Sequence, residues 1–281
     1  MPDPSPPGAA GTPGSPSPHS LEPYSLEPEP AAPRLTGEVI LRPDAEDLHY
    51  ALACDLLLHA FNCVRAFGDF HLALSGGSTP LPFYRRLMVD PLFRDFPWKR
   101  THLWIVDERR VPPDDERCNF LQISETLVEH SDIPRSQVHS MDALAPNADR
   151  AYEKELRDTL SWREKGHDRL DFVLLGMGSD GHTASLFPRS PAIAEHRRLV
   201  VLNSGPTVTP PDRVTMTLPL INASRFVAVL VTGSAKRAAI ERVALAAATG
   251  ALQTEDMPIL GVKPIGGALR WYVDHEAAPP A

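Results

Sequence analysis

The strongest constraint on the fold is a regular alternation of short apolar segments with longer helical segments from residue 38 onward. The apolar segments that read as strands lie at 38–42, 70–75, 101–108, 171–176, near 198–203, near 213–218, 225–233 and 268–273. Most are separated by stretches of helical periodicity, and strands that alternate with such helices are typical of a parallel sheet covered on both sides. We predict an α/β fold, with a mostly parallel, doubly wound sheet and helices on both faces.

The helical stretches carry their own boundary signals. Asp44 is placed to cap a helix that runs to about Ala66, with Leu48, Leu52 and Leu56 repeating every four residues. Asn147 is placed to cap the helix 148–162. Other helices are expected after the segment GGSTP, from about Asn119, and over 234–248.

Proline content divides the chain into two parts. Eleven of the thirty prolines fall within the first 34 residues, where apolar groups are too few to offset the entropy of ordering. We predict a disordered tail over residues 1–37, for which a docking role is an alternative, and a single catalytic domain over 38–281.

Composition excludes several classes of protein. The formal net charge of −8 argues against nucleic acid as a partner, because binding to phosphate backbones relies on a basic surface. No apolar run approaches the roughly 20 residues that a membrane span needs. The N-terminus lacks the basic start and apolar centre of a signal peptide. We therefore expect a cytoplasmic protein with no membrane partner.

The three cysteines fit a reducing compartment. Cys54 and Cys63 are nine residues apart on one expected helix, which places them on opposite faces and beyond disulfide reach, and Cys118 stands alone. The chain has no CxxC pair and no HxxxH pair, so local spacing indicates no zinc site. We predict reduced structural thiols and no metal.

Parallel sheets bind ligands at the carboxyl ends of their strands. In this chain four strand ends carry unusual chemistry, at 75–80, 107–109, 176–182 and 233–236. We expect these segments to meet and to form the site.

The segment DFVLLGMGSDGHTASLFP contains a GxGxxG pattern at Gly176, Gly178 and Gly181. A dinucleotide site needs a full helix after this pattern and a carboxylate about 20 residues on. Pro188 follows Gly181 by only seven residues, and the next expected strand ends without a carboxylate. The alternative is that the glycines form a loop that presents His182, whose imidazole suits a general base at neutral pH or, more simply, caps a short helix.

The segment LALSGGSTP suits a phosphate. Gly76 and Gly77 allow backbone amides to turn toward a ligand, and Ser78 and Thr79 add hydroxyl groups at a helix N-terminus. The alternative is a tight turn with a helix cap. No Gly-Lys-Ser/Thr follows, so the segment is not a nucleotide-binding P-loop.

Three cations lie near these loops. Arg109 ends an apolar strand in the triplet Asp107-Glu108-Arg109, although such triplets are usually solvated. Lys236 is expected in the first turn of a helix, where the helix dipole disfavours a cation unless an anion binds there. Arg213 is a second anion ligand or an ordinary surface arginine.

Taken together, the motifs resemble the 6-phosphogluconolactonase family. LALSGGSTP, VDERRVPPDDERCNF, LLGMGSDGHTASLFP and RVTMTLPLIN occur in the family's order, and the likeness covers roughly residues 38–275. The sequence is especially similar to that of the lactonase domain that is fused to hexose-6-phosphate dehydrogenase in some eukaryotes. One departure is Cys118, which stands where the family usually has serine.

The resemblance implies hydrolysis of 6-phospho-D-glucono-1,5-lactone, with this sugar-phosphate lactone as the partner and with neither a metal nor an organic cofactor. It implies a monomer or small homo-oligomer. His182 would be the general base, Asp180 would orient it, and Arg109 would help to stabilise the oxyanion together with backbone amides. The implied phosphate ligands are Gly76, Gly77, Ser78, Thr79, Arg213 and Lys236.

Two other functions fit parts of the pattern. Glucosamine-6-phosphate deaminases have a similar loop but carry a glutamate just before the proline, where this chain has Phe187. Sugar-phosphate sensors of transcription regulators keep the phosphate loop but also carry a DNA-binding helix-turn-helix. Residues 1–37 are too rich in proline to form one.

Overall fold

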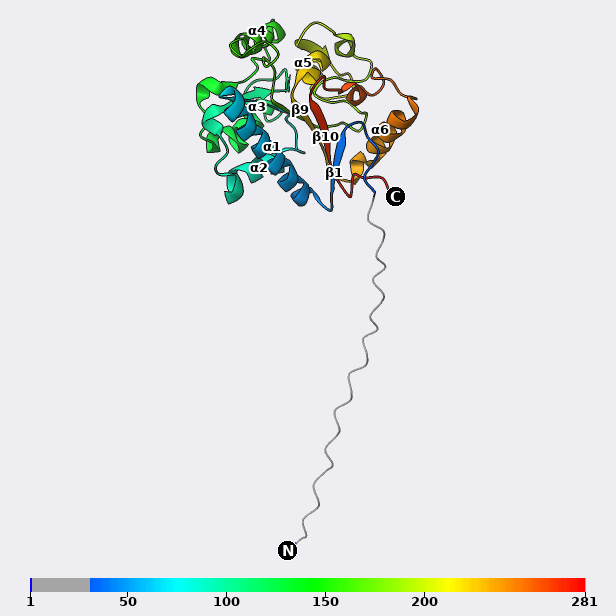
Figure 1. The fold of residues 1–281 in the computed structure, drawn as a ribbon. Coiled ribbons are helices and arrows are strands. Elements are labelled where there is room, and N and C mark those ends of the chain that lie inside the picture. The colour runs from blue at the N-terminus through cyan, green and yellow to red at the C-terminus, as the bar shows by residue number, and fades with distance from the viewer. Residues whose placement is uncertain (2–30, 281) are drawn as a thin grey trace.

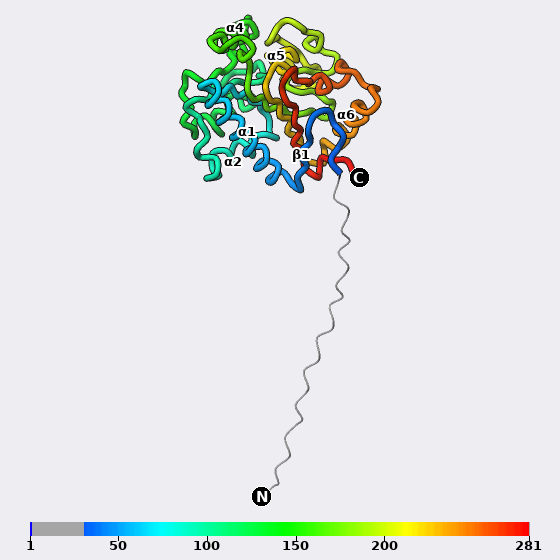
Figure 2. Tube along the Cα trace, in the orientation of Figure 1, coloured from blue at the N-terminus to red at the C-terminus, as the bar shows by residue number. Residues whose placement is uncertain are grey.

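The main sheet in the computed structural model, which describes residue 1 and residues 31–280, is built from the apolar segments that the sequence predicts. Its strands are β1 (Glu38–Arg42), β2 (Phe70–Leu74), β3 (Thr101–Ile105), β5 (Val138–His139), β6 (Phe172–Leu175), β9 (Phe226–Val231) and β10 (Ala268–Asp274). They are ordered β1-β10-β9-β6-β2-β3-β5, and every pair is parallel. β1 and β10 are neighbours although they lie near opposite ends of the chain (Figures 1 and 2).

Helices cover both faces of this sheet, as predicted. They are α1 (Ala45–Phe67), α2 (Leu81–Val89), α3 (Asn119–Thr126), α4 (Ala148–Leu160), α5 (Leu218–Ala223) and α6 (Arg237–Thr249). Successive side chains of a strand point to opposite faces. Accordingly, Leu72 and Leu74 pack in a core with residues of α1, α2 and α3, whereas Ala73 packs in a core with residues of α4, α5 and α6. Figure 1 shows α1 and α2 across the sheet from α6.

A second, small sheet was not foreseen. β4 (Asp107–Arg109), β7 (Val200–Ser204) and β8 (Asp212–Met216) form an antiparallel sheet in the order β4-β8-β7. The single strand expected over 101–108 is therefore two strands. The chain passes from one sheet to the other at Val106, whose N–H donates to Leu74 O and whose carbonyl accepts from Met216 N.

Helix boundaries agree with the sequence in part. The Asp44 side chain accepts from Asp47 N at 2.9 Å, which confirms the cap of α1. Asn147 stands at the N-cap position of α4, but its side chain makes no capping hydrogen bond. The segment expected to begin the last helix, Ser234–Lys236, forms a 3-10 turn, so Lys236 immediately precedes α6.

The predicted tail lies largely outside the described residues, at 2–30. Of the residues that follow, Leu35 packs against the core, and Thr36 O accepts from Trp271 Nε1 at 2.9 Å. The cysteines are free, with Cys54 exposed and Cys63 buried on opposite faces of α1 as expected. Among the described residues, no helix combines the length and the apolarity of a membrane span.

Candidate active site

The four predicted strand ends meet around one cavity of about 470 Å³, which is within the usual range for small-molecule sites. It lies beyond the carboxyl ends of β2 and β6, with the small sheet on one side. The predicted residues that line it are Gly76, Gly77, Ser78, Thr79, Arg109, His182, Arg213 and Lys236. Asp180 does not line the cavity but contacts the side chain of His182, which does.

The loop after β2 leaves its polar groups available to a ligand. α2 begins at Leu81 with Pro80 at its N-cap position and no side-chain capping bond, so neither Ser78 nor Thr79 acts as the helix cap. Gly77 has a φ of +90°, which favours glycine. The loop is anchored from α2, because the Tyr84 hydroxyl donates to Ser75 O at 2.6 Å.

Gly76 is required by a close approach between two loops. A Cβ at this position would lie 1.9 Å from Asn119 Oδ1, which no side-chain adjustment of a few tenths of an ångström relieves. Asn119, the first residue of α3, donates from Nδ2 to Asp107 O at 2.7 Å. The glycine therefore lets the loop after β2 pack directly against Asn119, which in turn contacts Asp107.

Two of the cationic residues face each other across the small sheet. Arg109 of β4 and Arg213 of β8 are directly opposed in the antiparallel register. Both Nε atoms are buried without a hydrogen-bond partner. Burial, and next the Arg109 charge, lower the pKa of Arg213, whose guanidinium lies 5.9 Å from the centre of the Phe187 ring. Opposed like charges are unfavourable, so this pair suits an anion.

Lys236 adds a third cation to the wall of the cavity. Burial lowers its pKa, and the charge of Asp180 opposes that effect. The ion pairs of the described residues include neither Lys236 nor the two opposed arginines. All three cations therefore keep their charge available for a ligand.

The glycines of the GxGxxG pattern form the turn that positions His182. The turn closes through hydrogen bonds from Gly178 N to His182 O and from Gly181 N to Gly178 O. A Cβ at Gly178 would lie 2.2 Å from His182 Nδ1 and 2.6 Å from Asp180 Oδ1, and Gly181 has a φ of +85°. In the described residues between β6 and β7 there is no α-helix. The dinucleotide alternative therefore lacks the helix that it needs.

Asp180 holds the imidazole of His182. Its Oδ1 lies 2.6 Å from His182 Nδ1 and 3.1 Å from His182 N. Burial raises the pKa of Asp180, but the hydrogen bonds from the side chain and backbone of His182 outweigh burial and lower it to about 2. An ionised carboxylate accepts, so Nδ1 carries the proton and Nε2 keeps its lone pair.

The cavity also contains residues that sequence reasoning did not assign to the site. Asp107 and Ser185 line it, and Ser185 Oγ donates to Asp107 Oδ2 at 2.6 Å. Asn119 and Phe187 line it as well. The only sequence signal for Asp107 was its place at a strand end next to Arg109. Nothing in the spacing relates it to Ser185, 78 positions away.

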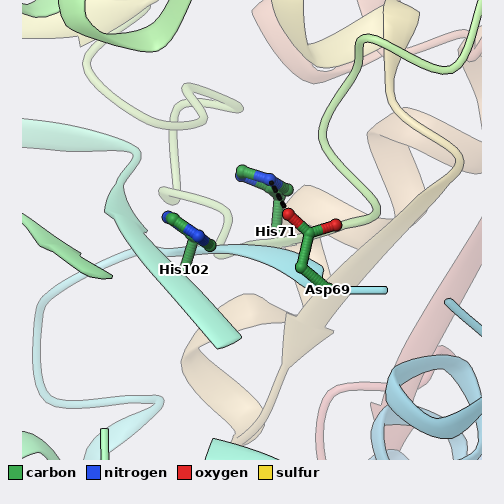
Figure 3. A group of neighbouring side chains, drawn as sticks. All are labelled: Asp69, His71 and His102. Atoms are coloured by element: carbon green, nitrogen blue, oxygen red, sulfur yellow. Dashed lines mark hydrogen bonds and ion pairs between the residues drawn. The ribbon is translucent and has the colours of Figure 1, made fainter. Parts of the chain in front are cut away.

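A second polar cluster lies at the amino ends of β2 and β3, away from the strand ends that line the cavity. Asp69, His71 and His102 come close enough to suggest a metal site (Figure 3). The rings of His71 and His102 are stacked at 15°, so their in-plane lone pairs do not converge on one ion. His71 already bonds Asp69 through Nε2 and Trp104 through Nδ1, and Asp69 pairs with Arg163. These residues fit a structural hydrogen-bond network and do not fit a metal.

A family model described as glucosamine-6-phosphate isomerases/6-phosphogluconolactonase matches residues 43–271. The chain belongs to this family. Its resemblance to the lactonase branch is supported by a human relative, the GDH/6PGL endoplasmic bifunctional protein, which is 41% identical over 241 residues. That match covers 83% of this chain but only 29% of the human protein.

Other family members match along nearly their whole length. The 6-phosphogluconolactonase of Mycobacterium tuberculosis is 34% identical over 251 residues, which cover 87% of this chain and 98% of that protein. The crystal structure of 6-phosphogluconolactonase from Thermotoga maritima superposes with a TM-score of 0.69 at 30% identity, covering 84% of this chain and 99% of the other. The 6-phosphogluconolactonase from Trypanosoma cruzi gives a TM-score of 0.74 at 27% identity, covering 88% and 97%. The predicted α/β fold is confirmed.

Proposed function

We propose that this protein hydrolyses 6-phospho-D-glucono-1,5-lactone to 6-phospho-D-gluconate, the second step of the oxidative pentose phosphate pathway. The proposal rests chiefly on one cavity, which contains an imidazole held by a carboxylate and cations that form no ion pair with any other described residue. The names of the relatives support the same reaction.

The phosphate of the substrate binds between the loop after β2 and the opposed arginines. Backbone amides of Gly76 and Gly77 and the hydroxyls of Ser78 and Thr79 donate from one side. Arg213 and Lys236 supply charge from the other. The negative charge of a phosphate beside Arg213 offsets the repulsion between its guanidinium group and that of Arg109, which favours phosphate binding.

The chemistry needs one general base. His182 Nε2 accepts a proton from a water molecule as the water attacks the lactone carbonyl, and Asp180 stabilises the imidazolium that forms. Arg109 and backbone amides of the glycine loops stabilise the developing oxyanion. When the ring C–O bond breaks, the imidazolium returns the proton to the leaving oxygen. Because the lactone is already electrophilic, the 10²–10⁴-fold that a general base typically supplies is sufficient.

The isomerase branch of the family needs further proton-transfer groups. The position that would carry a glutamate in that branch is Phe187, which is buried with its ring centre 5.2 Å from that of His182. An aromatic ring cannot take part in aldose–ketose proton exchange. This residue favours lactone hydrolysis over deamination.

We further propose a cytoplasmic protein that acts as a monomer or small homo-oligomer without a cofactor. The free thiols support a reducing compartment, whereas the human relative is named an endoplasmic protein. Cell fractionation with a tagged full-length chain, and light scattering of the purified protein, test location and oligomeric state. Recovery in a sealed, protease-protected vesicle fraction would contradict the proposed location.

A coupled assay tests the reaction. Glucose-6-phosphate dehydrogenase generates the lactone, and the disappearance of the lactone is followed with and without this protein. We expect hydrolysis well above the spontaneous rate, and a His182→Ala preparation purified in parallel controls for contaminating lactonases. Turnover of glucosamine 6-phosphate with no effect on the lactone would overturn the proposal in favour of the isomerase branch.

A further inference from the structure

Asp107 is the one acidic residue among the described residues that line the cavity. The lysine and arginine residues of the lining are Arg109, Arg213 and Lys236. A carboxylate in this position weakens the attraction of the cavity for a phosphate, because like charges repel through the low dielectric of a partly buried site. Its presence therefore calls for a role other than phosphate binding.

The carboxylate of Asp107 is rigidly held. Oδ2 accepts from Ser185 Oγ at 2.6 Å, and the Asp107 carbonyl accepts from Asn119 Nδ2 at 2.7 Å. Ser185 is itself fixed, because its N–H donates to Thr215 Oγ1 at 3.1 Å and its carbonyl accepts from Asn203 Nδ2 at 2.7 Å. Ser185 thus anchors the carboxylate through Oδ2, and the position of Ser185 is fixed in turn by Thr215 and Asn203.

One oxygen of this carboxylate has no partner. Asp107 is 7% exposed, and among the hydrogen bonds of the described residues none reaches Oδ1. In the part of the chain that the structure describes, Asp107 forms no ion pair, although its charge acts on Arg213. Asp107 lines the cavity, and an acceptor there that gains no donor from the ligand costs free energy once the ligand displaces water.

We propose that Asp107 determines specificity by accepting a hydrogen bond from a ring hydroxyl of the substrate. This inference rests on the proposed function, because the sugar-phosphate lactone is the ligand that brings both an anion and hydroxyl donors into the cavity. The phosphate satisfies the cations, and a hydroxyl satisfies Oδ1. Asp107 thereby favours polyhydroxylated lactones over deoxygenated ones of the same charge.

The test is a double-mutant cycle between protein and substrate. Lactones of 6-phosphogluconate and of its 2-deoxy, 3-deoxy and 4-deoxy analogues are compared with the unchanged protein and with Asp107→Asn. We expect the unchanged protein to discriminate against at least one analogue by tenfold or more in kcat/KM, because a hydrogen bond to a charged group is strong. In Asp107→Asn that discrimination should fall at least fivefold. For the other analogues, the ratio of kcat/KM between the parent lactone and the analogue should stay constant.

A binding measurement separates this role from a structural one. Inorganic phosphate, measured as a competitive inhibitor, should bind Asp107→Asn as tightly as the unchanged protein or more tightly, since a negative charge has left an anion site. Asp114→Asn, which removes an exposed carboxylate from the neighbouring loop, is the matched control and should alter neither result.

Two results would overturn this inference and leave the proposed function intact. One is an equal loss of kcat/KM on every lactone, which would place Asp107 at the reacting groups. The other is a loss of phosphate affinity, which would give it a structural role. If the unchanged protein hydrolysed none of the lactones, the proposed function would fail and this inference would fail with it.

Discussion

Arg109 and Arg213 are cross-strand neighbours in the antiparallel sheet β4-β8-β7, and both line the same cavity. Directly opposed like charges destabilise a sheet, and burial adds to the cost. This strain is local and sits next to the phosphate loop. This pairing of like charges is the feature of the fold that motivates the proposed anionic ligand.

Replacing Arg213 by alanine should impair binding more than chemistry. If the guanidinium binds the phosphate as proposed, it does so equally in the ground state and the transition state, so we expect KM to rise at least tenfold with kcat nearly unchanged. Steady-state kinetics over a wide range of lactone concentration measure both constants. If kcat collapsed while KM stayed constant, Arg213 would act on the reacting carbonyl instead.

Replacing His182 by alanine should remove the general base. We expect kcat to fall at least a hundredfold, with an unchanged circular dichroism spectrum and Tm. His196→Ala, at an exposed position, is the matched control and should retain full activity. Turnover that survived in His182→Ala would eliminate this residue as the base.

Gly178→Ala should inactivate the protein although it replaces none of the proposed catalytic side chains. The added methyl group would lie 2.2 Å from Nδ1 and 2.3 Å from Cε1 of His182, so the imidazole must move. We expect a loss of kcat comparable to that of His182→Ala. In Gly176→Ala the new Cβ meets no atom within 4 Å, and the imidazole stays in place. Equal activity of the two variants would show that the close contact has no consequence for catalysis.

Stability should fall with acid because of buried histidines. Burial, with a smaller contribution from the Arg86 charge, lowers the pKa of His49 from 6.5 to about 4. Between these values the unfolded chain binds more protons than the folded one, so stability decreases as the pH falls from 6.5 toward 4. His49→Gln should flatten the dependence of Tm on pH in this interval. His130→Gln, at an exposed position, should leave the slope as it is, and an unaltered slope in His49→Gln would refute the assignment.

Local sequence accounts for most of the fold. Alternating side chains on β2, the cap at Asp44 and the glycine-rich turns are decided within a few residues, so periodicity and turn chemistry predict them. The division of 101–108 into β3 and β4 was missed, because an apolar segment that passes between two sheets has the same pattern as one strand.

The amino-acid sequence by itself determined which segments would line the cavity: the loop after β2, the His182 turn and the cationic residues Arg109, Arg213 and Lys236. Tertiary structure decided how they combine. It placed Arg213 opposite Arg109 through sheet register, brought Asn119 onto Gly76, and fixed Asp107 with Ser185. These contacts join segments far apart in the chain. No local pattern encodes them, because they depend on the packing of the whole sheet and its helices.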